Sequence, residues 1–204
     1  MRLNQGRVLM LTGRIERGRV RKGDHVELVG FHSSLVAHVT DIDAGKLRVD
    51  EARAGMNVGL LLRGVPAGAA ERGQVLAAPG SIEAHGGFAA DIVVLPEHQG
   101  GGEVLTGGRL HLSIHAADVW GVVTLSHDTD VLRPLHQGAV TVTLERPVAL
   151  EEGQSFAFRH HGRAAGSGTV TQLLRRAHEW SREPTEAASV RPPHADAPGN
   201  RFSR

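Results

Sequence analysis

Residues 12–30, which read TGRIERGRVRKGDHVELVG, decide the fold of this chain. Short runs of β-forming residues alternate here with glycines at points where the chain must turn. We expect Gly18 to turn one hairpin and Lys-Gly-Asp at 22–24 to turn a second. The apolar residues between these turns then face the core of a small β-domain: Val20, Val26 and Leu28.

The same pattern continues through most of the 204 residues. Short β-rich runs recur at 26–29, 35–39, 58–62, 92–95, 110–114, 119–125, 140–144 and 168–174. Several of them alternate apolar and polar residues, which is typical of a strand with one side on a core. Glycines are expected at turns between the runs: Gly18, Gly23, Gly55, Gly64, Gly73, Gly138 and Gly153. Many short strands at this spacing predict barrels or sandwiches.

The chain divides best at residues 78–81, Ala-Pro-Gly-Ser. We therefore predict one β-domain over residues 1–80 and a second over residues 82–175. Residues 173–180 could form one or two helical turns. The polar, proline-containing segment 176–204 has little to bury and is predicted to be a disordered tail.

The overall composition excludes several classes of protein. A formal net charge of +1 offers no electrostatic basis for non-specific nucleic-acid binding, and the absence of cysteine excludes disulfides and thiolate zinc sites. On a strand, His111 and His115 would stand roughly 13 Å apart, so we expect no metal site. The sequence has no apolar run long enough for a membrane span and no nucleophile motif such as G-x-S-x-G. We therefore expect a cytoplasmic, non-enzymatic protein without a membrane partner.

Further segments follow residues 12–30 in a recognisable order. They occupy residues 54–64, 71–82, 88–95, 118–121, 146–149, 152–159 and 162–171. Together they resemble the second and third domains of the bacterial elongation factor Tu family, over about residues 6–174. The resemblance implies an all-β fold of two antiparallel β-barrels, packed together.

The GTPase domain of that family finds no counterpart in these residues. A GTPase needs a P-loop whose amides and lysine hold the phosphates, whereas the sole Gly-Lys pair, Gly45-Lys46, is followed by Leu47 and lacks the loop's opening glycine. GTP and magnesium are cofactors of the family, and we expect neither here.

The resemblance also implies positions that would contact aminoacyl-tRNA. In the first barrel, Thr12 and Asn57 match residues that line the amino-acid pocket, although they are also ordinary strand and turn residues. The terminal adenosine of the family lies against Glu-Met-Phe-Arg, which here becomes Asp41, Ile42, Asp43 and Ala44. The aromatic and the arginine are lost, and stacking alone is worth roughly 1–3 kcal/mol per base, so we expect this pocket to be inactive.

In the second barrel the family contacts the T-stem of tRNA. Arg109, Arg163 and Gly166 match that surface, whereas a Gln, a Thr and a Glu of the family become His111, Trp120 and His160. We therefore expect most of this recognition surface to be lost while the fold remains.

Three functions stay open at this point. The chain could be a translation-class binding module that keeps weak contact with tRNA or the ribosome. It could be a repurposed paralogue whose barrels bind a protein partner, or the remnant of an interrupted elongation-factor gene. The sequence identifies neither the partner nor the oligomeric state.

Overall fold

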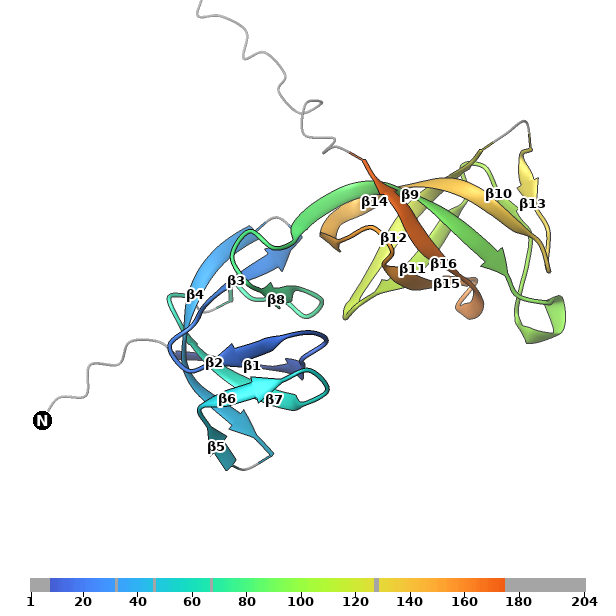
Figure 1. The fold of residues 1–204 in the computed structure, drawn as a ribbon. Coiled ribbons are helices and arrows are strands. Elements are labelled where there is room, and N and C mark those ends of the chain that lie inside the picture. The colour runs from blue at the N-terminus through green and yellow to red at the C-terminus, as the bar shows by residue number, and fades with distance from the viewer. Residues whose placement is uncertain (1–7, 32, 46, 67, 127–128, 175–204) are drawn as a thin grey trace, which may run out of the picture.

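The structure is a computed structural model that describes residues 8–31, 33–45, 47–66, 68–126 and 129–174. Two β-domains follow one another along the chain (Figure 1). Within the described ranges the only helix is a single 3-10 turn, Glu97–Gln99. The predicted all-β class is confirmed. In the part of the chain described here, no helix has the length and apolar character needed to cross a membrane.

The first domain is an antiparallel sheet with two free ends. Its strands are β1 (Val8–Arg14), β2 (Arg19–Arg21), β3 (His25–Gly30), β4 (Ser33–Ala44), β5 (Leu47–Val49), β6 (Glu51–Arg53), β7 (Asn57–Arg63) and β8 (Val75–Ala77). Six of them form one sheet in the order β1-β7-β4-β3-β8, with β5 paired to β4. The remaining two, β2 and β6, pair with each other. Among the described residues the order does not return from β8 to β1, so both are edge strands there.

The turns expected at Gly18 and Gly23 are present, but the prediction that each of them closes a hairpin is wrong. Both glycines have positive φ, 66° and 96°, as a tight turn requires. However, β2 pairs with β6 and not with the strands on either side of it in the sequence. The turn backbones bond to distant residues instead: Ala54 N–H donates to Gly18 O at 2.9 Å, and Gly23 N–H donates to Val39 O at 2.8 Å.

The core of the first domain lies on the inner side of this curved sheet. Val20, Val26 and Leu28 are buried as predicted. Val39, Ile42 and Leu62 are fully buried in the same domain, from the two central strands β4 and β7. Alternation indicates which side chains of β7 face inward, whereas on β4 it shifts by one residue at the bulge between Val39 and Asp41.

The second domain is a closed barrel. Its strands are β9 (Glu83–Val94), β10 (Val104–Leu105), β11 (Arg109–Ile114), β12 (Ala117–Leu125), β13 (Val131–Leu132), β14 (Gln137–Leu150), β15 (Ser155–His160) and β16 (Arg163–Leu173). Six strands close in the order β11-β12-β14-β9-β16-β15, with β15 paired back to β11. The other two, β10 and β13, pair separately. Closure removes the edges that the first domain keeps.

Aromatic rings fill the interior of this barrel. Phe88 and Phe156 meet edge to face with ring centroids 5.3 Å apart, and Phe158 is buried beside them. The prediction of a turn at Gly138 is wrong, because this glycine lies inside β14. A Cβ atom there would stand 3.2 Å from the Leu132 side chain, so close packing explains the glycine.

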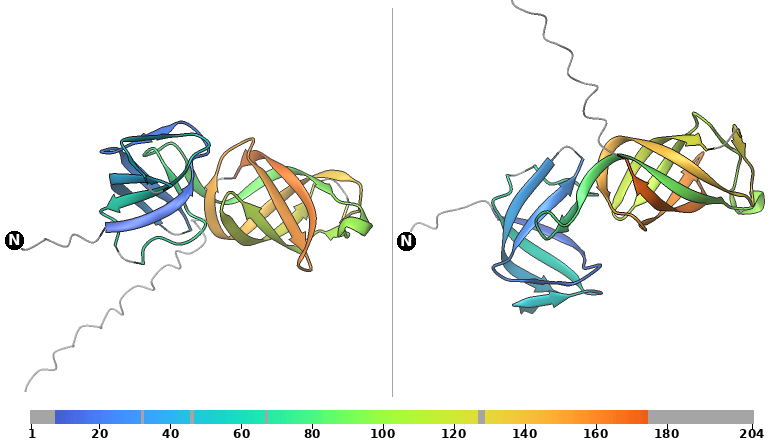
Figure 2. Two further views of the ribbon diagram at one scale, coloured as in Figure 1. Left: turned by 90° about the horizontal axis from the view of Figure 1, so that it is seen from below. Right: turned by 45° about the horizontal axis from the view of Figure 1, so that its top comes forward.

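Phe31, which directly follows β3, joins the two domains. They lie side by side in both views of Figure 2. Phe31, in a left-handed conformation with φ 58°, is buried in the hydrophobic core of the second domain. Its N–H donates to Pro147 O at 2.5 Å, and the Arg146 guanidinium lies 3.8 Å from its ring centroid. Arg146 also pairs with Glu71 at 2.8 Å. A residue of the first domain therefore completes the core of the second.

The connection between the domains is a hydrogen-bonded turn held against β3. Ser81 N–H donates to Ala78 O at 3.0 Å, and Gly80 N–H donates to the Glu27 carboxylate at 2.7 Å. The Gly80 amide, followed by the Ser34 hydroxyl, lowers the pKa of Glu27. The strand β16 continues through Leu173, so a helix does not begin at that residue. The predicted tail, residues 176–204, lies outside the described residues.

Candidate functional site

Thr12 and Asn57 come together on the outer side of the first sheet. Thr12 on β1 lies opposite Gly59 on β7, and Asn57 is two residues from Gly59 on the same strand. Their side chains therefore point to the same side of the sheet, and both are exposed. A Cβ atom on Gly59 would stand 2.4 Å from Met10 Cε, so the end of the Met10 side chain lies over Gly59, beside Thr12 and Asn57.

The Asp41–Ala44 segment lies on β4, across β7 from Thr12. Asp43 is opposite Gly59, which places this segment beside Thr12 and Asn57. Asp41 is the one buried polar or charged residue among those described, with 9% of its surface exposed. It forms an ion pair with Arg48 on the neighbouring β5, and Lys22 Nζ lies 3.8 Å away.

These contacts leave few groups that could bind a nucleotide beside Thr12 and Asn57. The Asp41 carboxylate is satisfied by cations of the chain itself, and both cations are held toward it. Ala44 is half-buried and packs against the hydrophobic core, where it offers no stacking surface. The structure therefore brings the predicted pocket residues together, but the Asp41–Ala44 segment contains neither an aromatic ring nor an arginine. The exposed Arg14 lies opposite Asn57 on β1.

The outer side of the second barrel is chemically different. His111 on β11 lies directly opposite Trp120 on β12, with ring centroids 5.0 Å apart. The Arg109 guanidinium lies 5.1 Å from the Trp120 ring centroid, a cation–π contact. Arg109 is also paired with Glu145. Trp120 remains 44% exposed, so a large part of its ring faces solvent.

Arg159 extends this surface from the next strand. It lies on β15 opposite His111, and its side chain is exposed. Arg163 opens β16 after the adjoining turn and is exposed as well. It pairs with His160, whereas Arg159 pairs with Ala164, so the Arg163 side chain points to the other side of the hairpin from Arg159. Among the described residues, no carboxylate lies within ion-pair distance of either guanidinium. Both arginines are therefore available to an anionic partner.

Two histidines complete the turn between β15 and β16. The strand ends at His160, and His161 has φ 48°, so the two side chains do not point to opposite sides as a continuing strand would require. Their ring centroids are 4.1 Å apart. Burial, followed by the neighbouring His161, lowers the pKa of His160, which favours the neutral imidazole.

Gly166 is explained by packing. A Cβ atom at this position would stand 2.3 Å from Phe158 Cζ and 2.3 Å from Val93 O. Such contacts are impossible without moving the barrel wall, so the residue must be glycine whatever binds outside. Of the three positions retained from the family pattern, Arg109 and Arg163 lie on the exposed surface, and Gly166 supports the strand behind it.

The sequence did not single out Arg159, although it is central to this surface. Its neighbours Phe156 and Phe158 are buried, so alternation alone indicates that Arg159 points outward. Its position beside His111 depends on the pairing of β11 with β15, which are separated in the sequence by the strands β12, β13 and β14 and by 40 residues. That pairing closes the barrel and cannot be read from local spacing.

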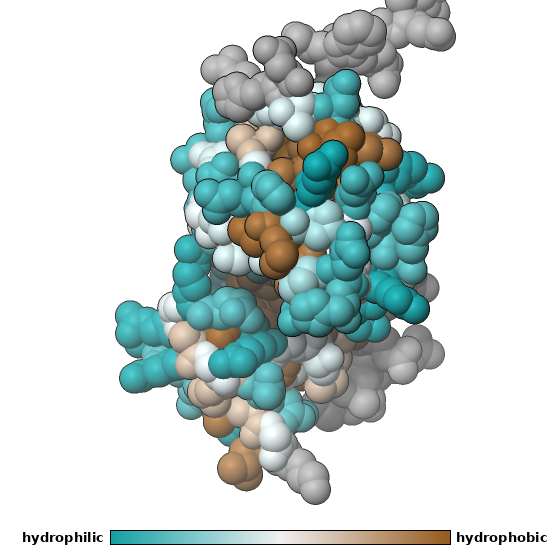
Figure 3. Space-filling model, turned by 90° about the vertical axis from the view of Figure 1, so that its right-hand side faces the viewer, coloured by the Kyte–Doolittle hydropathy of each residue, from teal (hydrophilic) through white to brown (hydrophobic). Residues whose placement is uncertain are grey.

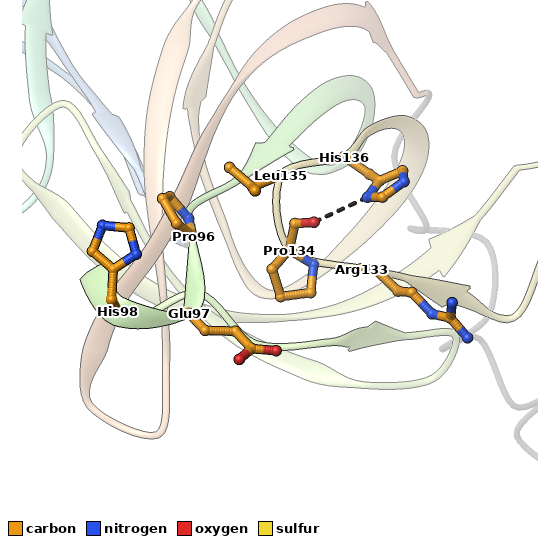
Figure 4. A pocket seen from close by; sticks show the side chains of 7 residues that line it. All are labelled: Pro96, Glu97, His98, Arg133, Pro134, Leu135 and His136. Atoms are coloured by element: carbon orange, nitrogen blue, oxygen red, sulfur yellow. Dashed lines mark hydrogen bonds between the residues drawn. The ribbon is translucent and has the colours of Figure 1, made fainter.

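A shallow hollow lies at the far end of the second barrel (Figure 4). It has a volume of about 450 Å³ and is lined by Pro96, Glu97, His98, Arg133, Pro134, Leu135 and His136. Leu135 has φ 66° and is 74% exposed, while His136 contacts Pro134 O at 2.9 Å. The view of this side shows hydrophobic patches within a mostly hydrophilic surface (Figure 3). The hollow lacks a convergent set of acid, base and nucleophile.

The histidines do not assemble a metal site in the described part of the chain. His115 lies in the turn after β11 with φ 51°, so it does not share a strand with His111. Across the described ranges, no group of three or more His, Cys, Asp or Glu side chains has the arrangement needed to hold a metal ion.

The described part of the chain thus consists of two tandem β-domains with exposed outer surfaces. Residues 9–77 match the family model described as Elongation factor Tu domain 2. Residues 81–174 match the model described as Elongation factor Tu C-terminal domain. The chain therefore belongs to the elongation factor Tu family. Both matched domains are non-catalytic, and no part of the 204 residues matches the GTPase domain of that family.

Proposed function

We propose that this chain is a non-catalytic RNA-binding module that contacts phosphates without reading an aminoacyl group. The contact surface consists of Arg109, His111, Trp120 and Arg159 on the outer side of the second barrel, with Arg163 at the end of the β15–β16 hairpin. The observation that carries the proposal is the pair of exposed arginines, Arg159 and Arg163, which have no carboxylate partner among the described residues.

The chemistry of this surface suits a nucleic acid. A guanidinium forms bidentate hydrogen bonds with phosphate, and arginines without an internal partner lose no ion pair when they do so. The exposed Trp120 ring can stack on a base or a ribose beside those phosphates. The net charge of +1 means that attraction comes from this patch and not from the whole molecule.

The first domain supports the second half of the proposal. Asp41 is paired with Arg48 and Lys22, and Ala44 occupies the position of the family's arginine, so the segment next to Thr12 and Asn57 offers no guanidinium to a ligand. A bound adenosine would have to displace these contacts without gaining a ring to stack on. Binding should therefore be indifferent to whether a tRNA is charged.

A titration of charged and uncharged tRNA against the full chain tests the proposal. We expect equal, weak and strongly salt-dependent affinity for both forms. Because a hydrogen bond to a charged group contributes about 1.5 kcal/mol, Arg159→Ala should weaken binding roughly tenfold. It should also lower the slope of log affinity against log salt by about 0.7–0.9, the value for one phosphate contact.

Arg19→Ala is the matched control, because Arg19 is exposed on β2 of the first domain and its replacement removes the same charge. It should leave the affinity unchanged. A clear preference for charged tRNA that Asn57→Ala abolishes would show that the first-domain pocket is active, and would contradict the proposal. Equal losses from Arg159→Ala and Arg19→Ala would show attraction to charge in general and no defined surface.

A further inference from the structure

Strand β1 leaves one of its two sides unpaired. In the described part of the chain it is hydrogen-bonded to β7 alone, over all seven residues from Val8 to Arg14. The other end of the sheet is much less available. There, β8 has three residues, and the turn after it is held to β3 through Gly80 and Glu27. The long free edge is therefore on β1.

The side chains of β1 are also incompletely covered. Val8 and Met10, on the outer side, are 47% and 52% exposed. Leu9 and Leu11, on the inner side, are only half-buried, whereas Leu60 and Leu62 on the neighbouring strand are 7% and 0% exposed. The core of the first domain thus remains partly open along this edge.

Apart from Arg14 at its end, this strand has none of the usual protective features. Native edge strands are commonly blocked by proline, lysine, inward-pointing charges or a bulge. The sequence Val-Leu-Met-Leu-Thr-Gly-Arg contains no proline, lysine or acidic residue, and its register with β7 is continuous. The central strand β4, by contrast, has a bulge between Val39 and Asp41. An unprotected edge of this length is suited to pairing with another strand.

We propose that β1 pairs antiparallel with β1 of a second copy, forming a twofold-symmetric dimer. The strand is self-complementary about Leu11. Pairing there places Met10 opposite Thr12, Leu9 opposite Gly13, and Val8 opposite Arg14. The two arginines lie at opposite ends of the paired strands, roughly 20 Å apart, so no like charges meet. Leu9 and Leu11 of both copies form one continuous inner side, and the two sheets join into one.

This dimer goes beyond the RNA contact and is independent of it, because β1 is in the first domain and the arginine surface is in the second. It gives an isologous interface, in which the same strand serves both copies. The dimer also carries two copies of the arginine surface. The partner that the edge fits is therefore this chain itself.

Sedimentation velocity of the full chain at tens of micromolar provides the first test. We expect a dimer for the native sequence. The double variant Met10→Lys and Thr12→Lys places lysines opposite lysines across the twofold axis, so it should be monomeric. Val36→Lys is the control, because Val36 is 54% exposed on the same sheet but on the internal strand β4; this variant should remain dimeric.

A charge-swapped partner separates loss of pairing from loss of folding. The variant Met10→Glu and Thr12→Glu should also be monomeric alone, and an equimolar mixture with the lysine variant should form a heterodimer. The chain contains no cysteine, so Leu11→Cys offers a clean cross-link. Residues directly opposite in an antiparallel pair have Cα atoms about 4.5–5.5 Å apart, within the range of a disulfide. Oxidation should cross-link this variant and leave Val36→Cys monomeric on a denaturing gel.

Two results would overturn the proposal. One is a native chain that stays monomeric at tens of micromolar. The other is a dimer that persists in the lysine variant, because the interface would then lie elsewhere. Failure of the oppositely charged variants to associate would likewise exclude the Met10–Thr12 register.

Discussion

The two domains of this chain differ in how their sheets end and in where their cations are held. The second domain closes on itself, with β15 paired to β11, while the sheet of the first runs from β1 to β8 without closing. In the first domain, Arg48 and Lys22 near the predicted amino-acid pocket are paired with Asp41. In the second, Arg159 and Arg163 have no carboxylate partner among the described residues.

The comparison shows that one β-rich architecture can leave different groups available to a partner. A closed barrel has no free backbone groups at an edge, so binding must use its outward side chains. An open sheet offers backbone groups as well, and here its exposed edge is apolar. We therefore assign RNA contact to the closed domain and self-association to the open one.

The largest expected effect tests whether the second domain is independent of the first. Phe31→Ala removes a buried ring that the first domain contributes to the core of the second. A buried Phe→Ala change costs about 3–5 kcal/mol of unfolding free energy. In scanning calorimetry we expect one unfolding transition for the native chain and two for the variant. The first of the two should lie at a lower temperature than the native transition.

Phe158→Ala is the matched comparison, because this ring is buried in the same core and comes from the barrel itself. It should lower the stability of the barrel without uncoupling the domains. A single transition at an unchanged midpoint in Phe31→Ala would show that the closed barrel does not depend on its neighbour.

A smaller effect is expected from Gly166→Ala, which asks whether this position serves packing or recognition. The new Cβ would meet Phe158 and the Val93 carbonyl, and overpacking of this kind costs about 1–3 kcal/mol. We expect a lower midpoint in urea and little change in RNA affinity at temperatures where the variant is folded. Gly162→Ala, in the open turn before β16, is a useful comparison: a Cβ there has no neighbour within 4 Å, although its φ of 77° adds some strain.

The smallest effect concerns the short β2–β6 pair of the open domain. Hydrogen bonds from Arg21 and then from Arg53 lower the pKa of Glu51 to about 2. Because the folded-state pKa is below the ordinary value of 4.5, this stabilisation is present above about pH 4.5 and is lost as the pH falls toward 2. Glu51→Gln should flatten the fall in unfolding free energy across that window.

The effect of Glu51→Gln on the unfolding free energy is expected to be small, since Glu51 is at the surface and solvent screens its ion pairs. Hydrogen exchange of the β2 and β6 amides at pH 3 and pH 6 would localise it. Equal exchange at both pH values in the native chain, once corrected for the intrinsic rate, would show that these ion pairs do not hold the two strands together.

Much of the candidate site followed from the sequence. The motif series identified the family. The substitutions at residues 41–44 predict that the adenosine contacts are lost, and this stays a prediction. The structure adds the reason that Asp41 does not attract a ligand cation: its partners are Arg48 and Lys22 of the same chain. The sequence did not single out Arg159, because its role in the surface depends on its position opposite His111, which is set by the pairing of β11 with β15.

The sequence by itself determined which residues form strands and which sides of them are buried. Alternation at 140–144 and the turns at Gly18 and Gly23 are local properties, because they depend on side-chain volume and on the φ values that glycine permits. The tertiary structure alone decided which strands pair. It paired β2 with β6, placed Phe31 in the core of the other domain, brought Arg159 beside His111 and left β1 with a free edge. These are contacts between distant residues, and no local pattern specifies them.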